Sequence, residues 1–204
     1  MKFYIFLLLL LNPCLNYGFK KNILSYSLVI AKADLIVDGT ISSVSNNYYE
    51  FTINQFIKGK SSLKIKVSIW EEWMCDGRAG ELKKGQRLIL FLENKPNMIY
   101  YPINESTGEL FIGKDDLPYP SMYMVERFPN ATVIKKGIKM FLDTYTVYGD
   151  LNDRFLQNVY FQSNKSIFEI YKMRDENTFF KYLIDNEMQY CKVKEISPVL
   201  QLNN

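Results

Sequence analysis

The strongest constraint on the fold is a series of apolar residues that recur at every second position between residues 35 and 92. In "SSLKIKVSIW", Leu63, Ile65, Val67 and Ile69 share one face, and lysine and serine occupy the other. Such alternation places successive side chains on opposite faces of an extended chain. The sequence therefore predicts four strands, in "ADLIVDGTISSVS", "YYEFTINQFIKG", "SSLKIKVSIW" and "RLILFLEN".

Three details refine this prediction. The alternation of the second strand shifts phase between Ile53 and Phe56, which indicates a β-bulge that bends the strand. The continuous apolar run of "RLILFLEN" favours a strand buried on both faces. Between residues 98 and 113, "MIYYPIN" and "ELFIG" flank the turn "ESTG" and predict a hairpin.

Beyond residue 129 the periodicity becomes helical. One helix is predicted to begin at Asn130 or Thr132 and to stop at Gly149, with an apolar face of Ile134, Ile138, Phe141, Leu142 and Tyr145. Asp175 is expected to cap a second helix, whose apolar face is Phe179, Phe180, Leu183, Ile184 and Met188. The segment 155–173 fits either a hairpin that turns at "SNK" or a longer helix, and we favour the hairpin. The expected class is β-rich α+β with C-terminal helices.

The first 18 residues have the pattern of a signal peptide. A charged start at Lys2 precedes an apolar run, which ends at Asn12 and Pro13. That run is shorter than the roughly 20 residues that span a bilayer, so we expect no transmembrane anchor. Cleavage is expected after Gly18, and the mature protein is expected to be secreted, periplasmic or in the cell envelope. The alternative is a lipid anchor on Cys14.

Two cysteines remain after removal of the signal, Cys75 and Cys191. In an oxidising compartment two cysteines most simply form one disulfide. The alternative is a pair of separate buried thiols. A bond between them would tie the C-terminal region to the loop after the third strand.

The chain contains no histidine, which narrows its chemistry. Ser-His-Asp and Cys-His catalysis and imidazole-containing zinc sites are excluded. No catalytic residue, cofactor site or metal site is predicted. The net charge of +3 is too small an excess to imply a nucleic-acid or membrane-surface partner.

Residues 33–112 resemble the netrin-like domain of tissue inhibitors of metalloproteinases and their bacterial relatives. The resemblance rests on an Ala-Asp strand that passes through a glycine, a Lys-Gly turn, a cysteine-bearing loop, and a glycine before "LILFL". The matching positions are Ala33, Asp34, Gly39, Lys58, Gly59, Cys75, Gly85, Leu90, Phe91 and Leu92. It implies a five-stranded Greek-key barrel of the oligonucleotide/oligosaccharide-binding (OB) type.

The expected organisation is therefore a signal peptide (1–18), a linker or short helix (19–32), an OB-type barrel (33–128) and a helical C-terminal extension packed on it (129–204). The animal inhibitors bind the protease zinc through an N-terminal cysteine. The expected mature start here, Phe19-Lys20-Lys21, has no cysteine, so only the scaffold is carried over.

The loop after the third strand holds the two residues that we single out for binding, Trp73 and Arg78, because tryptophan and arginine are enriched in binding hot spots. The alternative places Trp70 in the core and leaves a solvated charged loop. The basic residues Lys58, Lys60, Lys64 and Lys66 suit either a single-stranded nucleic acid or simple solubility and edge protection, and we favour the second.

Together these features predict an exported, non-enzymatic module that binds a protein or another extracellular ligand, and not a nucleic acid. One alternative is a carboxylate-dependent hydrolase that acts on extracellular glycans. The other is a structural protein of the cell envelope. The oligomeric state is not indicated.

Overall fold

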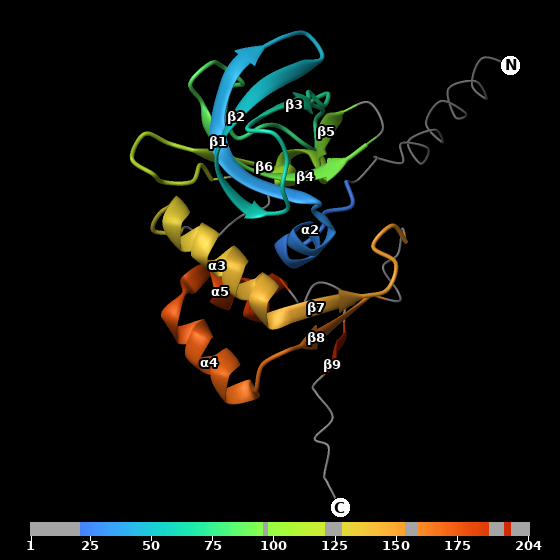
Figure 1. Cartoon of the computed structure of the whole chain (residues 1–204), viewed down its shortest axis with the longest axis vertical. Coiled ribbons are helices and arrows are strands. Elements are labelled where there is room, and N and C mark those ends of the chain that lie inside the picture. The colour runs from blue at the N-terminus through green and yellow to red at the C-terminus, as the bar shows by residue number, and fades with distance from the viewer. Residues whose placement is uncertain (1–20, 96–97, 121–127, 154–158, 188–193, 197–204) are drawn as a thin grey trace, which may run out of the picture.

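The computed structural model describes residues 21–95, 98–120, 128–153, 159–187 and 194–196. Figure 1 shows a barrel at one end of the molecule and a group of helices with a second, smaller sheet at the other. A short helix, α2 (Tyr26–Lys32), lies between these two parts. The signal peptide predicted at 1–18 lies outside the described residues.

The barrel strands precede the main helices, as the periodicity predicts, but the C-terminal half also contains a small three-stranded sheet. The barrel half contains β1 (Leu35–Val44), β2 (Tyr48–Lys58), β3 (Lys64–Ser68), β4 (Arg87–Asn94), β5 (Ile99–Pro102), the 3-10 turn η2 (Glu105–Gly108) and β6 (Glu109–Ile112). The C-terminal half contains α3 (Ala131–Thr144), β7 (Tyr145–Tyr148), β8 (Tyr160–Ser163), α4 (Ile167–Glu176), α5 (Thr178–Tyr182), the π-helical turn η3 (Leu183–Glu187) and β9 (Lys194–Ile196).

Five strands close into a barrel in the order β1-β2-β3-β5-β4, because β1 and β4 also pair with each other. All of these pairings are antiparallel except β3 with β5, where Lys66 lies opposite Ile99 and Val67 opposite Tyr100. A mixed, closed five-stranded barrel with added helices confirms the predicted β-rich α+β, OB-like fold.

The bulge predicted in β2 is present. The register against β1 shifts after Ile53 and again after Phe56, so β2 carries extra residues at Asn54 and Ile57. Bulges increase local bending and twist, which a small barrel requires. Gly39 of β1 supports the same bend, because a Cβ there would lie 2.2 Å from the carbonyl oxygen of Thr52.

Strands β1 and β4 are buried on both faces, as predicted for "RLILFLEN". Leu88, Leu90 and Leu92 point into the barrel interior. Ile89 and Phe91 belong instead to a second core that the barrel shares with α2, α3 and α5. Ile36 of β1 belongs to the second core as well, so the two cores meet across β1 and β4.

The hairpin predicted between residues 98 and 113 is wrong. Strands β5 and β6 do not pair with each other; both pair with β4, which uses its other edge for β1. They follow one another along that edge and are separated by η2. Asn104 and Glu105 adopt left-handed backbone angles at the start of η2, so "ESTG" forms a helical turn rather than a hairpin turn.

The first C-terminal helix begins where predicted but ends earlier. The Asn130 side chain caps α3 by accepting a hydrogen bond from the backbone N–H of Val133 at 3.0 Å. The helix ends at Thr144, and Tyr145 begins strand β7. Gly149 follows that strand, so it does not stop the helix.

The favoured hairpin at 155–173 and the Asp175 cap are also corrected. Strand β8 pairs with β7 and β9, and the "SNK" segment leads from β8 into α4. Asn177, not Asp175, caps α5, with its side chain accepting from the N–H of Phe180 at 2.8 Å. The predicted apolar face of that helix is buried at Phe179, Phe180 and Leu183, whereas Met188 lies outside the described residues.

A buried carboxylate joins α3 to the barrel. Asp38, 2% exposed, accepts two hydrogen bonds from Arg87 of β4, at 2.8 and 2.7 Å, and one from Lys135 of α3 at 2.6 Å. Burial opposes ionisation of Asp38, but hydrogen bonds from Arg87 and Lys135 outweigh it and lower its pKa. Three separate elements are thus fixed around one charge.

The Lys-Gly turn after β2 has a structural role. Lys58 donates to the carbonyl oxygens of Ile30 and Ala31, at 3.0 and 2.9 Å, and so binds the C-terminal end of α2. Gly59 has φ +73°, and a Cβ there would lie 2.2 Å from the carbonyl oxygen of Asp34. These contacts account for Lys58, Gly59 and Asp34 on packing grounds. None of the helices described here is long and apolar enough to cross a bilayer.

Candidate functional site

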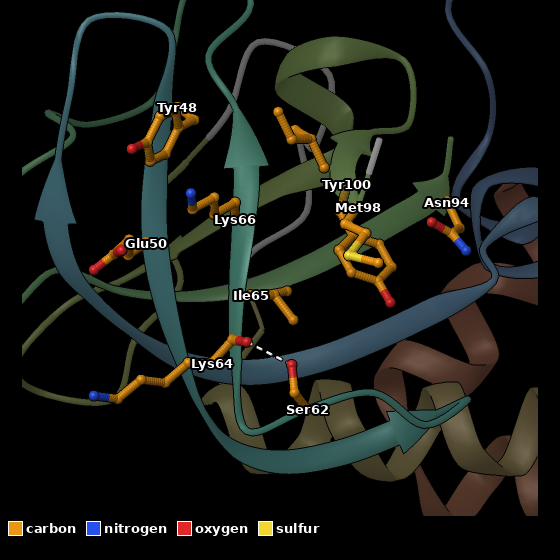
Figure 2. Close-up of a pocket in the computed structure, with 10 residues that line it drawn as sticks. Tyr48, Glu50, Ser62, Lys64, Ile65, Lys66, Asn94, Met98 and Tyr100 are labelled. Carbon is orange, nitrogen blue, oxygen red and sulfur yellow. Dashed lines mark hydrogen bonds between the residues drawn. The ribbon is translucent and has the colours of Figure 1, made fainter. Parts of the chain in front are cut away.

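An open groove of about 650 Å³ lies on the outer surface of the barrel, between β2, β3, the end of β4 and the residues at the start of β5. This is the face that OB barrels use for oligonucleotides and oligosaccharides. Figure 2 shows the residues around it, which are Tyr48, Glu50, Ser62, Lys64, Ile65, Lys66, Asn94, Met98, Ile99 and Tyr100.

Strand alternation determines which side chains face the groove. Ile65 and Val67 of β3 fill the barrel interior, so Lys64 and Lys66 point outward. The same alternation buries Tyr49 and Phe51 of β2 and leaves Tyr48 and Glu50 on the outside. Leu63, which the sequence placed on the apolar face, precedes β3 and is 66% exposed.

The two lysines of the groove bring two positive charges to it, beside one carboxylate, that of Glu50. The ammonium group of Lys66 lies 4.8 Å from the centre of the Tyr48 ring, a cation–π contact. Glu50 is the cross-strand neighbour of Lys66, but its Oε2 accepts a hydrogen bond from Ser43 at 3.0 Å instead. Neither Lys64 nor Lys66 forms an ion pair within the described residues.

The opposite wall comes from the end of β4 and the start of β5. Met98 is 89% exposed and has φ 58°, a left-handed conformation that is uncommon outside glycine. Tyr100 is half-buried and packs against the barrel core. The wall combines an adaptable thioether, an aromatic ring and the exposed amide of Asn94.

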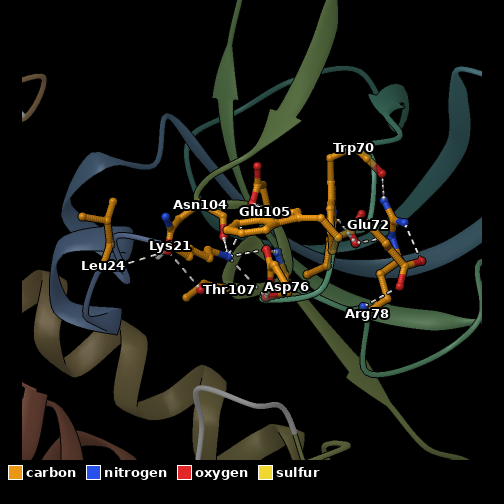
Figure 3. Close-up of polar contacts among 12 residues, drawn as sticks. Lys21, Leu24, Trp70, Glu72, Asp76, Arg78, Asn104, Glu105 and Thr107 are labelled. Carbon is orange, nitrogen blue, oxygen red and sulfur yellow. Dashed lines mark hydrogen bonds and ion pairs between the residues drawn. The ribbon is translucent and has the colours of Figure 1, made fainter. Parts of the chain in front are cut away.

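The loop after β3 is organised around Arg78, as Figure 3 shows. Its guanidinium lies 3.9 Å from the centre of the Trp70 ring and donates to the Trp70 carbonyl oxygen at 2.8 Å. It also donates to Glu72 and to Glu109, each at 3.0 Å. With a side chain only 6% exposed, Arg78 holds the loop on the barrel, and its predicted role in ligand contact stays a prediction.

Glu109 is the buried end of this arrangement. Its carboxylate accepts hydrogen bonds from Tyr49 at 3.0 Å and Trp70 at 2.9 Å, besides that from Arg78. Burial raises the pKa of Glu109 despite these partners. Burial, followed by the charge of Glu109, also raises the pKa of Tyr49 well above its ordinary value. The three donors replace the water that this carboxylate loses.

The N-terminal segment is attached to the same end of the barrel through Lys21. Its ammonium group forms a buried ion pair with Asp76 and donates to the carbonyl oxygen of Asn104 at 2.7 Å. The Asn104 side chain accepts from the N–H of Leu24 at 3.1 Å and donates to the carbonyl oxygen of Asn22 at 2.9 Å. The loop at 104–106 thus holds residues 21–24 against the barrel (Figure 3).

The carboxylates of Asp76 and Glu105 both lie beside the ammonium group of Lys21. Burial disfavours ionisation of Asp76, but hydrogen bonds from Lys21 and Ser106 lower its pKa. Burial and a hydrogen bond with Asp76 raise the pKa of Glu105. Trp73, the other residue predicted for binding, is half-buried and donates to Glu105 at 3.4 Å. Opposed pKa shifts are what acid–base chemistry requires, yet Lys21 and Ser106 already occupy the oxygens of Asp76.

The disulfide between Cys75 and Cys191 stays a prediction. Cys75 is exposed in the tight turn between Trp73 and Asp76, and Cys191 lies outside the described residues. In the part of the chain that the structure describes, no three acidic, cysteine or histidine side chains group closely enough to hold a metal ion.

Comparison with known proteins returned no match to any family model and none to any curated protein. The resemblance to netrin-like domains therefore remains a prediction from the sequence.

The sequence indicated Lys64 and Lys66 as candidate binding residues but not the other residues that line the groove. It grouped Lys64 and Lys66 with Lys58 and Lys60, whereas Lys58 binds α2 and neither Lys58 nor Lys60 lines the groove. Tyr48, Met98 and Tyr100 were missed because their proximity depends on the parallel pairing of β3 with β5. The only local signal was the exposed-face position of Tyr48 in the alternating pattern of β2.

Proposed function

We propose that the protein is an exported, non-enzymatic binding module that holds an extracellular ligand in the groove between β2, β3, the end of β4 and the start of β5. The observation that carries the proposal is the pair of outward lysines, Lys64 and Lys66, which face a concave surface without an ion-pair partner among the described residues. Polar groups that converge on a concave surface are a usual mark of a binding site.

Solubility alone does not account for this arrangement. A solubilising lysine projects into water, whereas Lys66 is held over the Tyr48 ring at 4.8 Å. Ordering Lys66 costs conformational entropy during folding, so less is lost when its charge binds a ligand. Among the described residues that line the groove, Glu50 is the single carboxylate, so the local charge favours an anionic partner.

The test uses the mature chain, beginning at Phe19, with the double variant Lys64→Gln/Lys66→Gln. Its control is Lys136→Gln/Lys139→Gln, which removes the same charge from the exposed face of α3. Native extracellular fluid or envelope extract is passed over each immobilised protein, and bound material is quantified. We expect the groove variant alone to lose retention. Equal retention by both variants would exclude the groove as the binding site.

A hydrolase remains the second candidate, because Asp76 and Glu105 have opposed pKa shifts. Release of reducing ends from an extracellular polysaccharide measures this activity directly. Cleavage by the native protein that Glu105→Gln abolishes would establish the hydrolase and refute the non-enzymatic module.

A further inference from the structure

We infer that the ligand of the groove is an acidic oligosaccharide, a glycan chain whose sugars carry carboxylate or sulfate groups. This inference rests on the proposed binding function and adds the chemical class of the ligand. It follows from three kinds of group that the groove presents together: unpaired ammonium groups, hydroxyl-binding groups and partly covered aromatic rings.

The ammonium groups supply the site for acidic substituents. Lys64 and Lys66 lie two residues apart on β3, so they project on the same side of the strand, about 7 Å apart along it. The Tyr48 ring holds Lys66, and Ser43 draws Glu50 toward β1. The groove thus offers two positive charges in a row, which suits an extended chain with repeated negative groups better than a single small anion.

The uncharged polar groups suit sugar hydroxyls. Glu50 retains acceptor capacity beyond its bond from Ser43. The side-chain amide of Asn94 has no hydrogen bond within the described residues, since only its backbone N–H is used, at 2.8 Å from Asp34. Ser62 donates its hydroxyl to the Lys64 carbonyl oxygen at 2.6 Å and keeps its lone pairs for a donor. Donors and acceptors side by side match a hydroxyl, which both gives and receives a hydrogen bond.

The same features disfavour a single-stranded nucleic acid. Non-specific strand binding relies on open aromatic faces on which bases stack. One face of the Tyr48 ring is already covered by Lys66, and Tyr100 is half-buried against the core. A phosphate backbone along β2 would also meet the carboxylate of Glu50 across from Lys66. Each sugar of an acidic glycan also has hydroxyls that can donate to Glu50, whereas the phosphates of a DNA strand have no donor and are only repelled by it.

The test is isothermal titration of the mature chain with hexasaccharides of one size and different charge. A carboxylated probe (oligogalacturonate), a sulfated probe (heparin-derived) and a neutral probe (cellohexaose) are compared with the oligonucleotide (dT)8. We expect at least one acidic hexasaccharide to bind about tenfold or more tightly than the neutral one, a difference of about 1.4 kcal/mol. The two acidic probes distinguish the carboxylate from the sulfate.

Variants locate the binding. Lys64→Gln and Lys66→Gln should each weaken the acidic hexasaccharide several-fold, and Lys136→Gln/Lys139→Gln should leave it unchanged. Tyr48→Leu should weaken binding more than Tyr48→Phe, which keeps the ring under Lys66. Equal binding of neutral and acidic probes, tighter binding of (dT)8, or no binding of any hexasaccharide overturns the acidic-glycan inference. The retention experiment tests separately whether the groove is the binding site, because its result does not depend on the class of ligand.

Discussion

Arg78 donates a hydrogen bond from Nε to the buried carboxylate of Glu109 at 3.0 Å. The pair joins the loop after β3 to strand β6, because Glu109 is the first residue of β6 and lies 31 positions after Arg78 in the chain. Because Trp70 covers the guanidinium on one side, the pair is screened from water and its loss is costly.

We therefore predict that Arg78→Met destabilises the fold by about 3–5 kcal/mol, because it leaves Glu109 buried without its charged partner. Urea unfolding followed by tryptophan fluorescence measures the change. The control is Lys83→Met, which removes a pair with Glu81 whose side chains are 63% and 74% exposed and should cost less than about 1 kcal/mol. Equal losses in the two variants would contradict a structural role for Arg78.

The attachment of the N-terminal segment gives a second prediction. Lys21→Met should cost about 3–5 kcal/mol of folding free energy, since it leaves the carboxylate of Asp76 buried without its cation. It should also make residues 21–24 susceptible to limited proteolysis while the barrel resists. Lys32→Met is the control, because the Lys32–Glu93 pair is only partly buried and its closest atoms are 3.9 Å apart. A protease-resistant N-terminal segment in Lys21→Met would refute this role.

Gly39 should not tolerate a side chain. In Gly39→Ala the new Cβ meets the carbonyl oxygen of Thr52 and the ring of Phe51, at 2.2 and 2.6 Å without relaxation. Overpacking of this kind costs about 1–3 kcal/mol. Gly77→Ala is matched to it, because the nearest atom to a Cβ there is 3.7 Å away. We expect thermal unfolding to shift downward only for Gly39→Ala, and an unchanged midpoint would show that β1 and β2 can separate at this point.

The Asp38 cluster predicts how stability changes in acid. The folded-state pKa of Asp38 lies below its ordinary value of 3.8, so in that range the unfolded chain binds more protons than the folded protein. The contribution of Asp38 is therefore complete above the unfolded pKa and is lost as the pH falls through 3.8 and then through the folded value. Asp38→Asn should lower stability at pH 7 and flatten its decline below pH 4, whereas Asp143→Asn, at an exposed position of α3, should not. If the stability of Asp38→Asn declined below pH 4 as steeply as that of the native protein, Asp38 would not be the source of this decline.

Peptide mapping without reductant tests the predicted disulfide. We expect one cross-linked peptide that contains Cys75 and Cys191, and a loss of about 4–5 kcal/mol on reduction under the chain-entropy description. A Cys75 peptide that is alkylated before reduction would contradict the pairing. The same digest reads the mature N-terminus, expected at Phe19. Diacylglycerol on Cys14 would replace the cleavage prediction with the lipid anchor.

Much of the barrel could be predicted from the sequence because each strand has a recognisable pattern of apolar and polar residues along its own length. The alternation of β3 and the phase shift of β2 follow from which side of a strand each residue faces. The unbroken apolar run of β4 likewise reports burial on both faces. These signals depend on a few neighbouring residues, so no long-range information is needed to read them.

The wrong or missed predictions share one physical cause, which is that they depend on contacts between residues far apart in the sequence. Strand β6 pairs with β4 rather than with its neighbour β5, and nothing in the residues between β5 and β6 distinguishes the two pairings. The segment "ESTG" is compatible with a turn in either case. Tyr145 continues the helical period of α3, but pairing with Ser163 of β8 draws it into a strand. Glu109 reads as an ordinary polar strand residue, because its partners Tyr49, Trp70 and Arg78 come from elsewhere in the chain.

The double burial of β4 determines how the molecule can be divided. A fragment cut at residue 112 would keep the barrel interior and α2 but lose α3 and α5, which complete the second core around Ile36, Ile89 and Phe91. The side of this core that α3 and α5 cover would then be open to water, and an exposed apolar surface of this kind favours aggregation. Neither half can be exchanged, shortened or expressed alone without rebuilding that shared layer, so sequence changes on the two sides of β4 must remain compatible with each other.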